Sequence, residues 1–101
     1  MELVWLFLSG SFMANGVPHF VKGVTGQAHM TPLKRVSSPM VNVVWGVVNF
    51  AIGVCLLIWG RVSPLANETN AIVFLVGVLA MGLACANLFS NPNAKFPWHK
   101  D

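Results

Sequence analysis

The feature that most constrains the fold is a run of 22 residues, 39–60, without a single charged side chain. A transmembrane α-helix needs about 20 mostly apolar residues to cross the hydrocarbon layer. Ser38 and Pro39 open the run as a typical helix start, because Ser caps free N–H groups and Pro fits the first helical turn. Arg61 and Pro64 follow its end. The run therefore predicts a membrane-spanning helix over about 39–60.

Two further apolar segments are long enough for the same purpose. One covers about 70–90 and is stopped by Pro92, and the other covers about 3–20. The N-terminal segment is short enough to be a signal peptide, but it has no cationic start and no good cleavage pattern. We therefore expect it to be a retained helix. The connections then fall at 21–38, 61–69 and 91–101.

The composition agrees with a membrane protein of one domain, 1–101. The chain is 55% hydrophobic and 9% charged, with a mean hydropathy of +0.68, whereas charged residues make up about a quarter of a soluble domain. The net charge of +3 comes from six scattered cations, which do not form the clustered basic face that nucleic acid needs. We expect an all-α, multi-pass protein of the cell membrane, with membrane lipids and no nucleic acid as partners.

The cations also predict an orientation, since Lys and Arg concentrate on the cytoplasmic side of a membrane. One side of the three predicted spans carries Lys22, Lys34, Arg35, Lys95 and Lys100, and the other carries Arg61 alone. We therefore expect the N-terminus outside and the C-terminus in the cytoplasm. The cations of the long loop, Lys22, Lys34 and Arg35, are also candidate contacts for lipid headgroups.

Small and polar residues recur on one face of each predicted helix. Helices in lipid associate through such faces, because backbones approach closely there and amides can hydrogen-bond. The candidate packing residues are Gly10, Ala14, Gly46, Gly53, Gly77 and Ala84. The faces can meet within one chain or between chains, and we expect a small helical bundle that forms an oligomer or joins a larger membrane complex.

Polar side chains within the spans are the candidate functional residues. They are Asn15, His19, Asn42, Trp45, Asn49 and Asn87. An amide in hydrocarbon needs a partner, so these residues form either hydrogen bonds between helices or a polar pathway or ligand site. The segment 15–20 contains Gly16 and Pro18 and predicts a helix that is broken at its end, which is the first place to look for a ligand. A plain helix terminus at the inner interface is the alternative.

The sequence also argues against catalysis. The carboxylates are Glu2, Glu68 and Asp101, all at chain ends or in the outer loop, so neither paired-carboxylate chemistry nor a triad is expected. The histidines lack the short spacings of metal sites, and we expect no metal and no cofactor. Two functions follow: a non-catalytic accessory or oligomerising subunit that acts through Asn/Gly-lined helix faces, or an oligomeric channel or passive carrier for a small solute or ion with an Asn/His-lined path.

Overall fold

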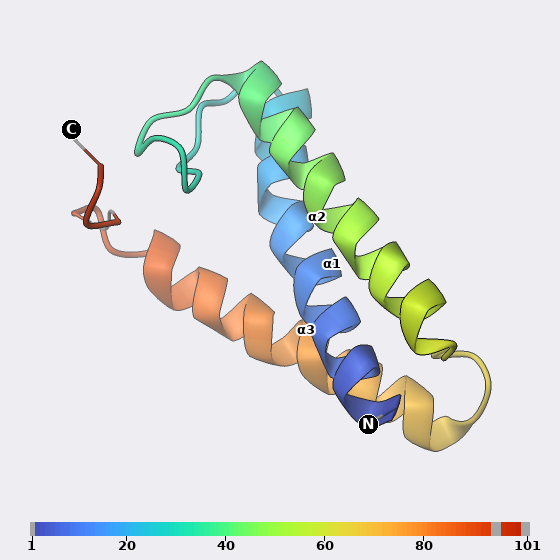
Figure 1. Cartoon of the computed structure of the whole chain (residues 1–101). Helices are drawn as coiled ribbons and strands as arrows, with labels where there is room; N and C mark the ends of the chain where they lie inside the picture. The colour runs from blue at the N-terminus through green and yellow to red at the C-terminus, as the bar shows by residue number, and fades with distance from the viewer. Residues whose placement is uncertain (1, 94–95, 100–101) are drawn as a thin grey trace.

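The chain folds into three α-helices joined by two connections (Figure 1). The computed structural model describes residues 2–93 and 96–99, so the remainder of the predicted tail lies outside the described residues. The helices are α1 (Glu2–Val24), α2 (Pro39–Gly60) and α3 (Glu68–Phe89). The expectation of an all-helical fold with three helices is confirmed. Of the three, α2 and α3 are long and apolar enough to cross a membrane.

Local hydrogen bonds define the ends of α2 and α3. The Ser38 hydroxyl accepts the Val41 N–H at 3.2 Å, and Arg61 ends α2 in the left-handed conformation, with its N–H donated back to the helix. At the start of α3, the Asn67 carboxamide oxygen accepts the Asn70 N–H at 2.8 Å. These caps satisfy backbone groups that a helix end otherwise leaves unpaired.

The first helix differs from the sequence-based expectation. The sequence left open a broken helix or a plain helix terminus at 15–20, followed by a loop from about residue 21, whereas α1 continues through Pro18 to Val24. Proline within a helix removes its own N–H from the ladder and crowds the carbonyl group four residues earlier, but tertiary packing can outweigh this cost. Here Gly16 and His19, on either side of Pro18, are both buried against α2 and hold the segment helical.

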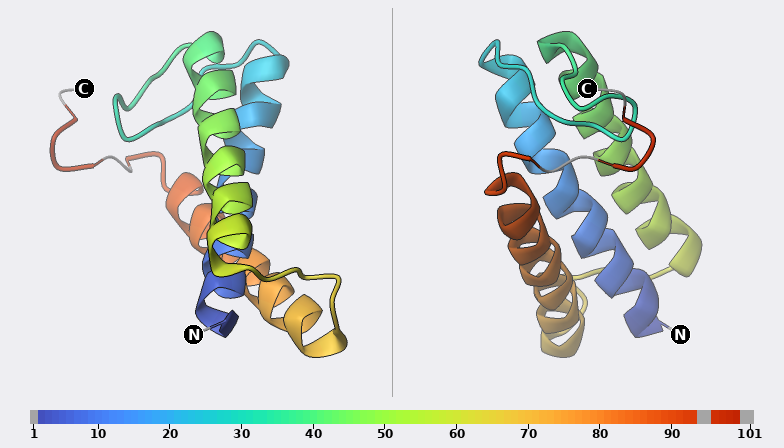
Figure 2. Two further views of the ribbon diagram at one scale, coloured as in Figure 1. Left: turned by 45° about the vertical axis from the view of Figure 1, so that its right-hand side comes forward. Right: turned by 90° about the vertical axis from the view of Figure 1, so that its left-hand side faces the viewer.

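Helix α1 lies between the other two and is their shared packing partner (Figure 2). Within the described residues, α2 and α3 make no helix-to-helix contact. The contact between α1 and α2 is antiparallel and close, because small residues meet along its length. A Cβ on Gly16 would lie 2.8 Å from the Gly46 carbonyl oxygen, and one on Gly53 would lie 2.9 Å from Met13 Cγ. The Ser9 hydroxyl donates to the Gly53 carbonyl at 2.7 Å.

The contact between α1 and α3 is concentrated where the two helices cross. At the crossing, Gly10 faces the Phe74 backbone and Gly77 faces the Phe7 carbonyl, and the Ser11 hydroxyl donates to the Gly77 carbonyl at 3.2 Å. Beyond it the two helices separate toward their C-terminal ends, and the 25–38 connection folds back toward the opening (Figures 1 and 2).

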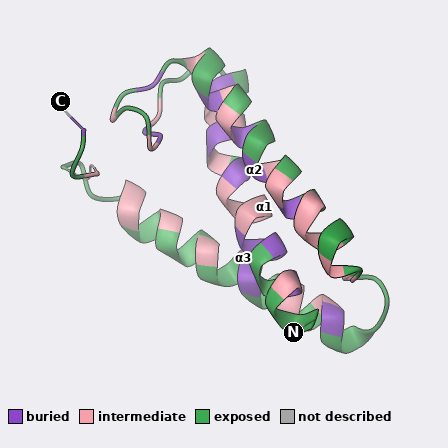
Figure 3. Ribbon diagram, viewed as in Figure 1, coloured by how far each residue is buried: buried purple, intermediate pink, exposed green. Residues whose placement is uncertain are grey.

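Burial is inverted relative to a water-soluble protein (Figure 3). Among the described residues, the only buried hydrophobic side chains are Leu6 and Met30. The buried polar residues are Ser9, Ser11, His19, Thr31, Ser37, Asn42, Asn49, Asn70 and His99. Large apolar side chains point outward instead: Val44 is 63% exposed and Leu79 is 61% exposed. Hydrogen bonds and close backbone contacts, more than apolar burial, therefore hold the helices together.

The helix crossing gives a matched pair of glycine substitutions. Gly77→Ala would place a methyl group onto the Phe7 backbone, whereas a methyl group at Gly82 meets nothing within 4 Å. We expect Gly77→Ala to destabilise the protein by about 1–3 kcal/mol, the usual cost of overpacking. Gly82→Ala should leave the free energy of unfolding unchanged or raise it. Unfolding of each variant by detergent titration in micelles gives these free energies, and equal midpoints for the two variants would contradict the close contact of Gly77 with Phe7.

Candidate functional site

The most highly connected polar group is the side-chain amide of Asn42, in the first turns of α2. Asn42 is fully buried, and its Nδ2 donates to the carbonyl oxygens of His29 (3.0 Å), Ser37 (3.1 Å) and Ser38 (3.0 Å). Its Oδ1 lies 3.0 Å from His19 Nδ1 on α1. One carboxamide therefore joins α1, the 25–38 connection and the start of α2.

These bonds also fix the protonation pattern of His19. The three carbonyl oxygens can only accept, so the Asn42 atom beside them is the NH₂ nitrogen, whose two protons serve all three with one of them shared. The Asn42 oxygen therefore faces the imidazole, and His19 Nδ1 donates to it. In the neutral ring the proton is then on Nδ1, and Nε2 carries the lone pair. Nε2 has no hydrogen-bond partner within residues 2–93 and 96–99.

A second amide pair lies about two turns further along the same helix interface. Asn15 Nδ2 donates to Asn49 Oδ1 at 2.9 Å, and Asn49 Nδ2 donates to the Trp45 carbonyl at 2.8 Å. The free oxygen of this pair, Asn15 Oδ1, lies 3.5 Å from the Cys85 thiol of α3. The predicted polar residues of α1 and α2 are thus bonded to each other within one chain.

The 25–38 connection is folded onto this site. His29 and Ser37 exchange backbone hydrogen bonds at 3.1 and 3.0 Å, and the Thr31 and Ser37 hydroxyls are 2.7 Å apart. The His29 ring lies 4.3 Å from that of Phe89 on α3, centroid to centroid. Burial, the largest cause, together with the Lys22 charge and repulsion from His19 when that ring is protonated, lowers the pKa of His29 to about 4, so the His29 ring is uncharged at neutral pH.

The C-terminal segment is tied to the same connection. His99 Nε2 lies 2.9 Å from the Thr31 carbonyl, and the Trp98 indole N–H donates to the Pro32 carbonyl. Arg35 donates to the Pro92 carbonyl at 2.6 Å. The connection and the tail together close the separated end of the bundle.

A cavity of about 210 Å³ lies beneath this closure. Its polar wall is formed by Asn15 and His19, and Cys85 lies beside them. The apolar lining comes from α2, α3, the connection and the tail: Met30, Pro32, Trp45, Met81, Ala84, Leu88, Phe89 and Phe96. The Trp45 indole N–H is buried without a partner in the described chain. No group of three His, Cys, Asp or Glu side chains suited to a metal ion occurs within residues 2–93 and 96–99.

The predicted residues of α3 lie differently from those of α1 and α2. Asn87 is exposed and lies apart from the hydrogen-bonded polar cluster of α1 and α2. Ala84 is also exposed, although it lines the cavity, whereas Gly77 is buried at the crossing. The reason is the divergence of α3 from α1: α1 still reaches Cys85 through Asn15, but Ala84 and Asn87 lie on sides of α3 that α1 leaves exposed.

The remaining predicted residues lie outside the cluster. Ala14 is half-buried beside a groove between α1 and α3. Lys22 donates to the Gln27 side chain at 3.0 Å, and Lys34 is exposed.

Sequence reasoning missed the contribution of the connection and the tail. His29, Thr31, Ser37 and His99 all bond within the site, yet none of them lies in a predicted span. One signal was available. Asn42 lies one turn after the helix cap at Ser38. The nearest carbonyl groups outside the helical ladder belong to the preceding connection, so the Asn42 amide is well placed to bind them.

Comparison of the chain with protein-family models, with curated proteins and with solved structures finds no match.

The Asn42 contacts predict the effect of removing the amide. Asn42→Leu should free the connection, because the His29 and Ser37 carbonyl groups lose their shared donor. A lost buried hydrogen bond costs about 1–3 kcal/mol, so amide hydrogen exchange across 28–38 should accelerate at least about tenfold. Mass spectrometry of the exchanged protein measures this. Asn87→Leu removes an exposed amide and serves as the control; equal protection in the two variants would contradict the role of Asn42.

Proposed function

We propose that the chain is a three-span protein of the cell membrane. The outward-facing apolar side chains support this, since water disfavours such a surface and lipid does not. Helices of 22 residues are about 33 Å long, enough for a hydrocarbon layer of about 30 Å. In this proposal α1 is the third span. Its lower apolarity has a structural reason, because its polar side chains Ser9, Ser11 and His19 are buried against the other helices.

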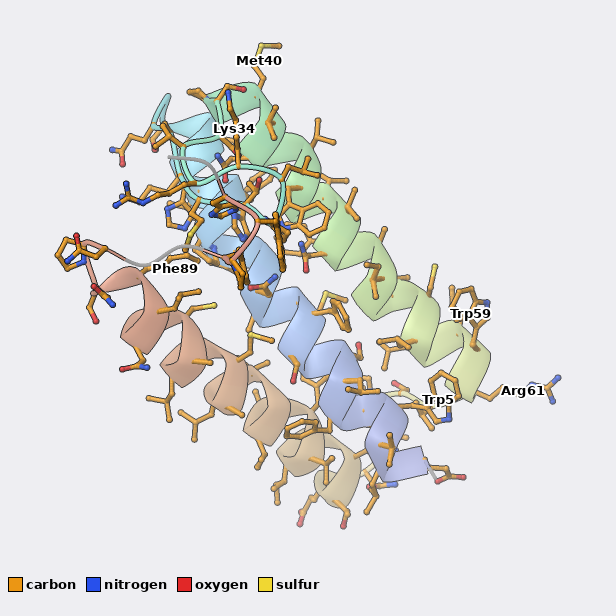
Figure 4. All side chains as sticks on the ribbon, turned by 60° about the vertical axis from the view of Figure 1, so that its left-hand side comes forward. Trp5, Lys34, Met40, Trp59, Arg61 and Phe89 are labelled. Atoms are coloured by element: carbon orange, nitrogen blue, oxygen red, sulfur yellow. The ribbon has the colours of Figure 1, made fainter. Side chains whose placement is uncertain are left out.

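The orientation proposed is N-terminus outside and C-terminus in the cytoplasm. Lys34 lies at one end of the bundle, and Arg61 lies at the other beside Trp5 and Trp59 (Figure 4). Tryptophan is enriched at membrane interfaces, and cations are enriched on the cytoplasmic side. The Lys22, Lys34 and Arg35 end would then meet the anionic headgroups of the inner leaflet.

A reporter fused after Asp101 tests the orientation. Green fluorescent protein fused there should fluoresce and alkaline phosphatase should be inactive, because both would lie in the cytoplasm. After Ala66, in the connection between α2 and α3, the readouts should be reversed: alkaline phosphatase active outside and green fluorescent protein dark. The reverse pattern, or the same side for both positions, would contradict the three-span topology.

For the biochemical role, we propose a non-catalytic accessory or oligomerising subunit that binds a partner helix through α3. The observation that carries this is the free face of α3, defined by the exposed residues Ala80, Ala84 and Asn87, which borders the cavity at Ala84. Small residues one turn apart let helices approach closely in lipid, and an amide there can bond across the interface. The corresponding Asn/Gly face of α2 is occupied by α1.

The contacts favour this role over a channel or carrier. The polar side chains expected along a path are hydrogen-bonded in pairs, Asn15 with Asn49 and His19 with Asn42. Toward the outer end, the α1–α2 interface continues as the close contact between Ser9 and Gly53. Paired amides at a packed interface stabilise helix association and leave few groups to solvate a moving solute.

The α3 face predicts a change in assembly upon substitution. Ala80→Phe should weaken self-association, because a bulky ring prevents close approach, and Asn87→Leu should weaken it less. Leu79→Phe changes an exposed position on another face of α3 and should have no effect. Native mass spectrometry or single-molecule photobleaching in nanodiscs gives the oligomeric state. If the partner is a different protein, it should co-purify with the wild type. A wild type that is monomeric and copurifies with no other chain would refute the proposal.

A further inference from the structure

We propose that the cavity beneath the connection and the tail binds a small, uncharged aromatic molecule that carries a hydroxyl group, of the phenol or hydroquinone class. The proposal rests on the cavity and on the His19–Asn42 contact, and it does not depend on the self-association of α3. Its ligand chemistry follows from the size of the cavity, the hydrogen-bonding groups in its wall and the charges around it.

The size of the cavity limits the ligand to about one ring. A dry apolar cavity of about 150 Å³ in a protein core holds a benzene molecule. The present cavity, at about 210 Å³, has room for one ring with a short substituent. Most of its lining is apolar or aromatic, including Met81, Leu88 and Phe96, which suits an aromatic ring rather than a sugar or an ion.

The polar wall selects the functional group. His19 lines the cavity and its Nδ1 is committed to Asn42, so the ring in its neutral form presents Nε2 as an acceptor. Asn15 Oδ1, the second acceptor in the wall, has only the weak thiol contact with Cys85. The lining also includes Trp45, whose indole N–H has no partner in the described chain. Two acceptors together with one unpartnered donor favour a ligand whose polar group can both donate and accept, such as a hydroxyl group.

The charges favour an uncharged ligand. Within residues 2–93 and 96–99, Cys85 is the only other ionisable group in the lining, and the Lys22 ammonium group donates to the Gln27 side chain. In the same described residues, no carboxylate lines the cavity to balance a cation, and no Lys or Arg lines it to balance an anion. Burial of an unbalanced charge is strongly unfavourable, whereas a phenol, with a pKa of about 10, is neutral at pH 7.

The test uses two probes of nearly equal shape, 4-fluorophenol and 4-fluorotoluene, which differ in the hydroxyl group. Fluorine NMR of the purified full chain in nanodiscs measures saturable binding of each. We expect the phenol to bind about fivefold more tightly than the toluene, which corresponds to one net hydrogen bond. His19→Asn removes Nε2 but can still donate to Asn42, and it should abolish this preference.

A second pair of variants tests the location. Ala84→Phe fills the cavity and should weaken phenol binding at least about tenfold, since no room for the ring is left. Ala80→Phe alters the same face of α3 one turn earlier, does not line the cavity, and should bind as the wild type does. Because Ala80→Phe also disrupts the proposed assembly face, phenol binding that survives in it separates the two proposals.

The outcomes that overturn the inference are specific. Binding that does not saturate in the wild type shows partition into lipid only. Equal affinity for the two probes removes the role of the hydroxyl group, and unchanged binding in Ala84→Phe places the ligand elsewhere. Each of these results leaves the oligomeric state, and with it the proposed function, as a separate measurement.

Discussion

The hydrogen bonding of Asn42 is the interaction on which most of the polar architecture depends. A buried carboxamide has two donors and two acceptor sites, and any that are left unpaired in an apolar setting are costly. Asn42 uses these groups to bind three carbonyl oxygens and one imidazole, so it fixes the connection, the first turns of α2 and the last turns of α1 as one unit. The tautomer of His19 and the polar wall of the cavity are consequences of that single contact.

The position of α1 explains why there is a cavity at all. Small residues keep α1 close to α2 from Ser9 to Gly23, whereas α1 meets α3 most closely at Gly10 and Gly77. Two helices that touch mainly near one crossing must separate beyond it. The connection and the tail fill this opening with hydrogen bonds and aromatic contacts, among them His29 on Phe89, and they leave the remaining space as the cavity.

The sequence predicted those parts of the fold that depend on local pattern. The bounds of α2 follow from an uncharged run with a Ser-Pro start, and its buried positions, Asn42, Gly46, Asn49 and Gly53, follow from the helical repeat. The crossing of α3 over α1 is not a local property, so the repeat grouped Asn87 with Gly77 although only Gly77 meets α1. Pro18 was likewise misinterpreted, since local propensity alone ignores the packing on either side of it. His99 and Thr31 are 68 residues apart, and no periodicity connects them.

The two proposals meet at Ala84, which lines the cavity and also belongs to the free face of α3. Because α2 does not contact α3, no other helix of the described chain covers the cavity on that side. A partner helix packed on Ala80 and Ala84 would therefore lie along the rim of the cavity. Binding free energies are reciprocal, so a ligand whose affinity depended on assembly would change the association constant of the assembly by the same factor. An Ala80→Phe variant that binds phenol as the wild type does would therefore show that the assembly face and the cavity, although both arise from the divergence of α3, are energetically independent.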